Sequence, residues 1–74
     1  MKQLRTIRKE RGIPVSSMAH LLGLSESTYR AYELNPPMFR LNHVIIISEA
    51  LQIQIEDIDW YHPYVKERQK GKSL

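Results

Sequence analysis

The sequence of 74 residues contains no cysteine and only one phenylalanine and one tryptophan. The lack of cysteine excludes disulfide bonds and thiolate metal sites. The longest apolar run, Val44–Ile47, is far too short to cross a bilayer. The basic N-terminal segment lacks the apolar core of a secretion signal. We therefore expect one small cytoplasmic domain that does not enter a membrane and is stabilised by packing, with or without a partner subunit.

Patterns typical of catalysis or metal binding are also missing from the sequence. His20, His43 and His62 are not spaced at i, i+3 or i+4, which two metal ligands on one helix face require. The serines between residues 16 and 27 have no base and orienting acid near them. There is no glycine-rich phosphate loop, and short helices leave little volume for a substrate cavity. We predict that the protein is not an enzyme and uses no cofactor or metal.

Positive charge is concentrated at the two ends of the chain. Residues 1–11 carry five basic residues against one acidic residue, and Lys66–Lys72 carries four against one. The residues between these segments are net acidic, so the whole chain has a net charge of +3. Basic ends attract phosphate groups, but they also aid solubility, and charge alone leaves both readings open. We expect a folded domain over residues 1–61 and a flexible basic tail over residues 62–74.

The central stretch of residues 15–33, VSSMAHLLGLSESTYRAYE, predicts two short helices joined by a tight turn. Met18 and Leu22 lie on one apolar side of the first helix because they are four residues apart. Gly23 can adopt the left-handed conformation that ends a helix abruptly. Ser25 is suited to cap the next helix, because its side chain can accept a bond from a free amide. Such a pair of helices projects the outer side of the second helix away from the domain.

The apolar spacing predicts five helices, over residues 2–11, Val15–Leu22, Glu26–Glu33, Leu41–Leu51 and Ile55–Trp60. The β-branched run Val44–Ile47 is also compatible with a strand. A helix is favoured because its expected inner face recurs with helical spacing, over Leu41, Val44, Ile45, Ile47, Ser48 and Leu51. Ile46 falls outside that helical face. The loop over residues 34–40 contains two prolines, which prevent the third helix from continuing. We expect Met38 and Phe39 in this loop to fold back onto the core.

A pattern of residues extends from residue 3 to about residue 60 and comprises Leu4-Arg5, Gly12-Ile13, Met18-Ala19, Leu22-Gly23-Leu24-Ser25, Thr28-Tyr29, Tyr32-Glu33, Leu41, Ala50-Leu51, Ile55 and Asp57-Ile58. This pattern resembles the phage Cro/repressor-type (XRE-like) helix-turn-helix family. The resemblance implies an all-α, compact five-helix, lambda-repressor-like domain. It further implies a sequence-specific transcriptional regulator of phage or bacterial type, such as a repressor, that binds double-stranded DNA as a homodimer.

The same resemblance implies roles for individual residues on the DNA side. Helix 26–33 is expected to enter the major groove and to read bases with Glu26, Ser27, Arg30 and Ala31. Phosphate contacts are expected from Ser25, Thr28, Arg40 and His43, together with the basic segments. Glu26 has a second reading as a residue that complements the helix dipole, and Arg30 as a solvated surface charge. Contacts with a second subunit or a partner are expected at Ile46, Trp60 and Tyr61, because Ile46 lies off the core stripe and the other two lie near the end of the domain. The alternative is that they are ordinary core or singly exposed apolar residues.

Two departures from the family pattern support an alternative function. The family often has a glutamine where this chain has Val15, and a loop rich in lysine and arginine where it has Pro36-Pro37-Met38-Phe39. Both changes remove phosphate contacts from the expected DNA side, and such contacts supply most non-specific affinity. The alternative is an antirepressor or antitoxin-like module that binds a partner repressor protein through apolar residues, with Val15, Met38, Phe39 and Ile46 as its candidates.

Overall fold

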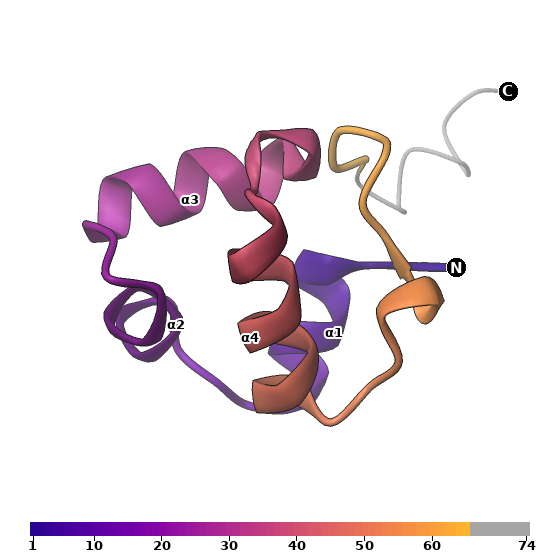
Figure 1. Cartoon of the computed structure of the whole chain (residues 1–74), viewed down its shortest axis with the longest axis horizontal. Helices are drawn as coiled ribbons and strands as arrows, with labels where there is room; N and C mark the ends of the chain where they lie inside the picture. The colour runs from indigo at the N-terminus through magenta and orange to yellow at the C-terminus, as the bar shows by residue number, and fades with distance from the viewer. Residues whose placement is uncertain (66–74) are drawn as a thin grey trace, which may run out of the picture.

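The computed structural model describes residues 1–65, and these residues are mostly helical (Figure 1). The elements in chain order are β1 (Lys2–Gln3), α1 (Leu4–Glu10), α2 (Val15–Leu22), α3 (Glu26–Leu34), the 3-10 turn η1 (Pro36–Met38), α4 (Leu41–Leu51), the 3-10 turn η2 (Ile55–Asp57) and β2 (Ile58–Asp59). None of the helices within the described residues has the length and apolarity needed to cross a membrane. The expected helical class is confirmed, and α2 and α4 have the expected bounds.

The expected five-helix count is wrong, because the described residues contain four α-helices. The segment Ile55–Trp60 makes only one 3-10 turn and then extends into β2. Strand β2 pairs in parallel with β1, so that Lys2 lies opposite Ile58 and Gln3 opposite Asp59. The backbone groups of Ile58 and Asp59 therefore bond between segments and not along a helix. The same pairing makes α1 begin at Leu4, two residues later than expected.

The four helices surround one apolar core. Helix α4 crosses in front of α1, while α3 runs along one side of the domain and α2 lies beside the start of α3 (Figure 1). The buried apolar residues come from every helix and also from the 34–40 loop and β2; they are Leu4, Ile7, Met18, Ala19, Leu22, Tyr29, Phe39, Ile47, Leu51 and Ile58. Because α2 and α3 both contribute to this cluster, the core fixes the angle between them.

The buried side of α4 is turned relative to the expected one. Ile47 and Leu51 are buried, and Ile46 packs against the core, whereas Ile45 is 44% exposed. The expectation that Ile46 lies off the core face was therefore wrong. The buried residues of α4 are four positions apart and are His43, Ile47 and Leu51. This spacing places Ile45 on the opposite side of the helix.

The loop after α3 folds back through only one of its two expected apolar residues. Phe39 is buried, with its ring centroid 5.9 Å from that of Tyr29 and 5.5 Å from that of Tyr32. Met38 is 52% exposed, so the expectation for this residue was wrong. Met38 and Phe39 are neighbours at the end of η1, and their side chains point in different directions. Only the Phe39 ring packs against Tyr29 and Tyr32.

A buried ion pair connects α1 to α3. The Arg8 Nε atom donates to a Glu33 carboxylate oxygen at 2.6 Å, and Arg8 Nη2 donates to the other oxygen at 3.1 Å. The Tyr29 hydroxyl donates to the same Glu33 carboxylate at 2.7 Å, and Arg8 Nη1 donates to the Ile13 carbonyl at 2.8 Å. The hydrogen bond from Arg8 to Glu33 raises the pKa of Arg8, and burial raises the pKa of Tyr29 well above its ordinary value. We call these three side chains the Arg8–Glu33–Tyr29 cluster.

Replacing Arg8 alone should destabilise the protein strongly. The variant Arg8→Met leaves the Glu33 carboxylate buried without its counter-charge, and such a loss typically costs about 3–5 kcal/mol. The double variant Arg8→Met/Glu33→Leu removes both charges and should recover more than half of that loss. Urea unfolding followed by circular dichroism measures both effects. A double variant less stable than Arg8→Met would contradict this account.

Candidate nucleic-acid interface

The turn between α2 and α3 depends on the backbone conformation of Gly23. Its φ of 69° and ψ of 29° lie in the left-handed region, which side-chain-bearing residues rarely adopt. The turn is closed by two backbone bonds, from Gly23 N to the His20 carbonyl at 3.2 Å and from Leu24 N to the Ala19 carbonyl at 2.9 Å. The chain therefore reverses within a few residues, as the sequence predicts.

Ser25 starts α3 by capping it. The Ser25 Oγ atom accepts a bond from the Thr28 amide at 3.1 Å and donates to Thr28 Oγ1 at 2.9 Å. This arrangement satisfies one of the amides that every helix leaves unpaired in its first turn. The first turn of α3 is consequently rigid, and the exposed Ser25 and Ser27 hydroxyls lie beside it.

The outward side of α3 carries the four expected base-reading residues. Glu26, Ser27, Arg30 and Ala31 are all exposed. Glu26 Oε1 lies 3.5 Å from Arg30 Nη2, and the two side chains are 51% and 60% exposed, so the pair is open to solvent. An exposed pair of this kind contributes little to stability, and either partner can exchange it for another contact. Tyr29 and Glu33 point the other way into the core and hold the helix from behind.

Other expected contact residues are placed less uniformly. Arg40 is exposed at the start of α4, and its amide donates to the Nδ1 atom of His43 at 3.3 Å. His43 is itself buried, with its ring centroid 6.0 Å from that of Phe39, which turns it inward. Trp60 is half-buried and donates from Nε1 to the Ile55 carbonyl at 2.8 Å, whereas Tyr61 is 72% exposed. The structure thus places Arg40 and Tyr61 at the surface and His43 in the core.

Most of the basic residues in the N-terminal segment contact other groups of the protein. Besides Arg8, the Lys2 Nζ atom lies 3.0 Å from a Glu10 carboxylate oxygen, and Arg11 Nε donates to the Leu51 carbonyl at 2.9 Å. The Arg5 guanidinium lies over the Tyr64 ring, 5.2 Å from its centroid. Arg5, Arg8 and Arg11 thus connect separate segments of the fold, whereas the exposed Lys2–Glu10 pair contributes little to stability. The sequence did not reveal these contacts. The charged segment 66–72 lies outside the described residues.

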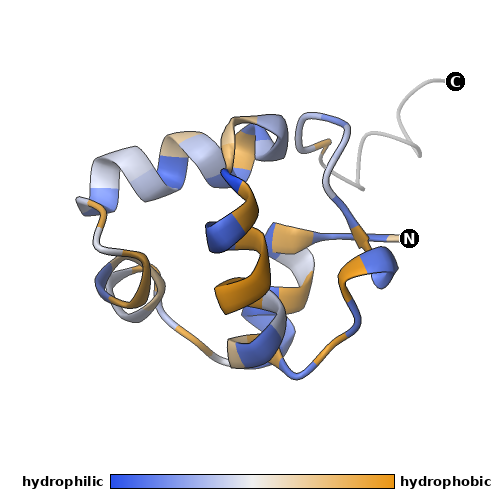
Figure 2. Cartoon of the chain, in the orientation of Figure 1, coloured by the Kyte–Doolittle hydropathy of each residue, from blue (hydrophilic) through white to orange (hydrophobic). Residues whose placement is uncertain are grey.

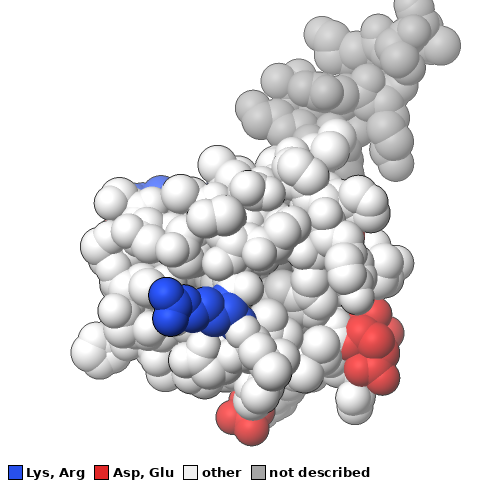
Figure 3. Space-filling view, turned by 45° about the horizontal axis from the view of Figure 1, so that its top comes forward, with Lys and Arg blue, Asp and Glu red and all other residues white. Residues whose placement is uncertain are grey.

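The surface around α4 is largely uncharged. Figure 3 shows this face with one prominent basic side chain near its centre and acidic side chains at its margins. Leu41 is 74% exposed, and Ile45, one turn later, lies on the same outer side. In Figure 2 the middle of α4 is coloured as apolar. An apolar surface therefore adjoins Arg40.

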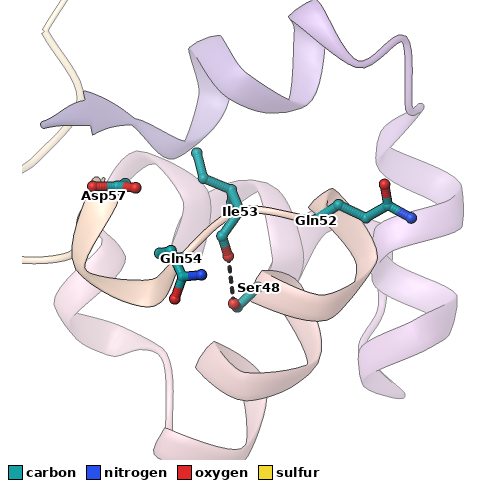
Figure 4. A pocket seen from close by; sticks show the side chains of 5 residues that line it. All are labelled: Ser48, Gln52, Ile53, Gln54 and Asp57. Carbon is teal, nitrogen blue, oxygen red and sulfur yellow. Dashed lines mark hydrogen bonds between the residues drawn. The ribbon is translucent and has the colours of Figure 1, made fainter.

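A depression of about 430 Å³ lies at the other end of α4, away from α3 (Figure 4). Its lining residues are Ser48, Gln52, Ile53, Gln54 and Asp57. The Ser48 hydroxyl donates to the Ile53 carbonyl at 2.6 Å, so this polar group serves the end of the helix. This hydrogen bond stabilises the C-terminal end of α4. The residues that line the depression are not part of the exposed side of α3.

Comparison with known families gives a match over most of the described chain. A sequence model described as helix-turn-helix matches residues 4–58. The chain belongs to the Cro/XRE-type helix-turn-helix family. This family is a DNA-binding regulatory family and not a family of enzymes. Comparison with curated proteins found no match, and comparison with solved structures found none either.

The cap of the second helix in this helix-turn-helix can be tested by Ser25→Ala. Loss of the Ser25 Oγ acceptor should lower the free energy of unfolding by about 1 kcal/mol. Ser16→Ala is the matched control, because Ser16 is exposed within α2 and does not cap a helix. Thermal melting of both variants measures the difference. Equal stability of the two variants would contradict the capping role of Ser25.

Proposed function

We propose that the protein is a sequence-specific transcriptional regulator of phage or bacterial type, a cytoplasmic repressor that places α3 in the major groove of operator DNA. One observation carries this proposal: α3 exposes Glu26, Ser27, Arg30 and Ala31 while its opposite side is fixed by the Arg8–Glu33–Tyr29 cluster. A rigid helix with short and polar outer residues can approach base edges closely. A homodimer would place two copies of α3 on two half-sites one DNA turn apart.

Each exposed residue suits a particular contact. Arg30 can donate two bonds to guanine after leaving Glu26, and Ala31 can contact a thymine methyl group. Ser27 can bond to a base edge. Ser25, Thr28 and Arg40 suit phosphate contacts at the border of the groove. We assign His43 an indirect role, because its Nδ1 atom accepts the Arg40 amide and so orients the backbone that carries Arg40.

The subunit contact is proposed at Tyr61 and the adjoining Trp60. Tyr61 is exposed, and Trp60 lies half-buried beside it with its indole held by the Ile55 carbonyl. Ile46 does not offer such a contact, since it packs against the core.

A second candidate function rests on the uncharged surface beside Arg40. Met38, Leu41 and Ile45 are exposed there, and related domains often carry cations in the loop that contains Met38, which favours a module that binds a partner repressor. A mobility shift with duplex DNA from upstream of the reading frame, at several salt concentrations, separates the two functions. Salt-dependent retardation supports DNA binding. A lack of retardation at low salt, together with a stable complex with a repressor, would favour the partner-binding module.

Replacing Arg30 should selectively weaken binding to the operator. Arg30→Ala removes the proposed guanine contact and should cost about 1–3 kcal/mol on the operator, with a smaller loss on random duplex. Arg40→Ala is the control, because loss of a phosphate contact should lower affinity for all sequences alike. Fluorescence anisotropy with both duplexes measures these losses. Equal losses of Arg30→Ala on the two duplexes would show that Arg30 does not read bases.

Replacing Glu26 separates its two readings. Glu26→Gln removes a negative charge near the phosphates and frees Arg30 from its ion pair, so affinity for random duplex should rise about twofold to tenfold. If Glu26 also accepts a bond from a cytosine amino group, preference for that base pair should fall. The same anisotropy assay, with an operator variant at each position, measures both effects. Weaker binding of Glu26→Gln to random duplex would contradict a repulsion between the Glu26 carboxylate and the phosphates.

A further inference from the structure

The residues that follow β2 turn back across the domain. Asp59 Oδ1 accepts the Tyr61 amide at 2.9 Å, and the Asp59 carboxylate lies 3.1 Å from His62 Nδ1. The amide bond from Tyr61 lowers the pKa of the Asp59 carboxyl, which keeps this acceptor charged. These contacts bend the chain so that the next residues run toward the end of α3, on the side of the domain opposite its first turn (Figure 1).

The end of this returning segment touches two helices. The Tyr64 amide donates to the Leu34 carbonyl at 2.9 Å, and Leu34 is the last residue of α3. The Gln3 side-chain amide, oriented to match its partners, donates to the Val65 carbonyl and accepts the Val65 amide, both at 2.9 Å. The Arg5 guanidinium covers the Tyr64 ring. The segment therefore joins the start of α1 to the end of α3.

The returning residues 61–65 lie outside the family match and outside the buried core. The match ends at residue 58, and Ile58 is the last described residue that belongs to the buried apolar cluster. Release of residues 61–65 would therefore expose little apolar surface. It would leave the final carbonyl of α3 unpaired and would remove one link between that end of the helix and α1, while the bonds from Arg8 to Glu33 remain.

We propose that residues 61–65 form a C-terminal strap that helps the Arg8–Glu33 pair to hold the end of α3 against α1, so that opening of the strap weakens DNA binding while the domain stays folded. The strap acts on the end of α3 that lies farthest from its first turn. A small rotation of a helix at one end displaces side chains at the other, and base contacts depend steeply on placement. The effect on DNA rests on the proposed function, whereas closure of the strap does not.

The test uses the full chain with two pairs of substitutions. Gln3→Ala/Tyr64→Ala removes the two bonds to Val65 and the ring beneath Arg5. Gln54→Ala/Ile55→Ala is the matched control, because it removes one glutamine and one large apolar side chain at exposed positions outside the strap. Neither pair alters the net charge, so a difference in DNA affinity between the pairs is not a general electrostatic effect.

Amide hydrogen exchange at residue 64 reports closure directly, because this amide donates to Leu34. We expect exchange about tenfold faster in Gln3→Ala/Tyr64→Ala than in the control, with the same helix content by circular dichroism. We also expect DNA affinity about threefold to tenfold lower. Unchanged exchange would overturn the strap. Faster exchange with unchanged affinity would overturn its coupling to α3.

A third outcome separates this proposal from the proposed function. If the unmodified chain binds no duplex at any salt concentration, the regulator function fails and the coupling to DNA fails with it. The exchange of residue 64 would still decide whether the strap is closed. If the double variant loses its helix content, Gln3→Ala alone provides the test, since it removes only the bonds to Val65.

Discussion

The arrangement of the domain depends on a buried charge pair between its first and third helices. Glu33 can be buried as a carboxylate only because Arg8 supplies two donors and Tyr29 a third. Such a cluster satisfies its charges in one relative placement of the helices, whereas apolar contacts tolerate several. Tyr29 and Glu33 occupy the inner side of α3. The cluster therefore fixes the orientation of this helix without using any residue of its outer side.

The distribution of charge follows from this use of cations inside the fold. Arg8 and Arg11 bind groups in α3 and α4, so the positive charge seen in the N-terminal sequence is not all available to a phosphate backbone. Arg30 and Arg40 remain exposed around α3 and the start of α4, beside an apolar surface. On the proposed function, this domain would depend more on side-chain fit in the groove than on general attraction to nucleic acid.

The sequence predicted what local chemistry determines and missed what distant contacts determine. The turn at Gly23, the cap at Ser25 and the bounds of α2 and α4 follow from residues close together in the chain. The strand pair of Lys2–Gln3 with Ile58–Asp59 joins segments more than fifty residues apart, and two residues show no alternation. Ile45 and Ile46 have the same side chain, so only the position of α4 against the core could decide which one is exposed. The inward turn of His43 depends likewise on the ring of Phe39.

The bonds between Gln3 and Val65 bring residues near both ends of the described chain together, far from the first turn of α3. A short peptide linker after Val65 could therefore meet Met1 and close residues 1–65 into a ring without crossing the helix-turn-helix. Ring closure removes conformations from the unfolded chain, and so raises stability without a new contact in the folded one. This domain has no cysteine and so cannot form a disulfide bond, and the linker would give it a covalent constraint of the same kind.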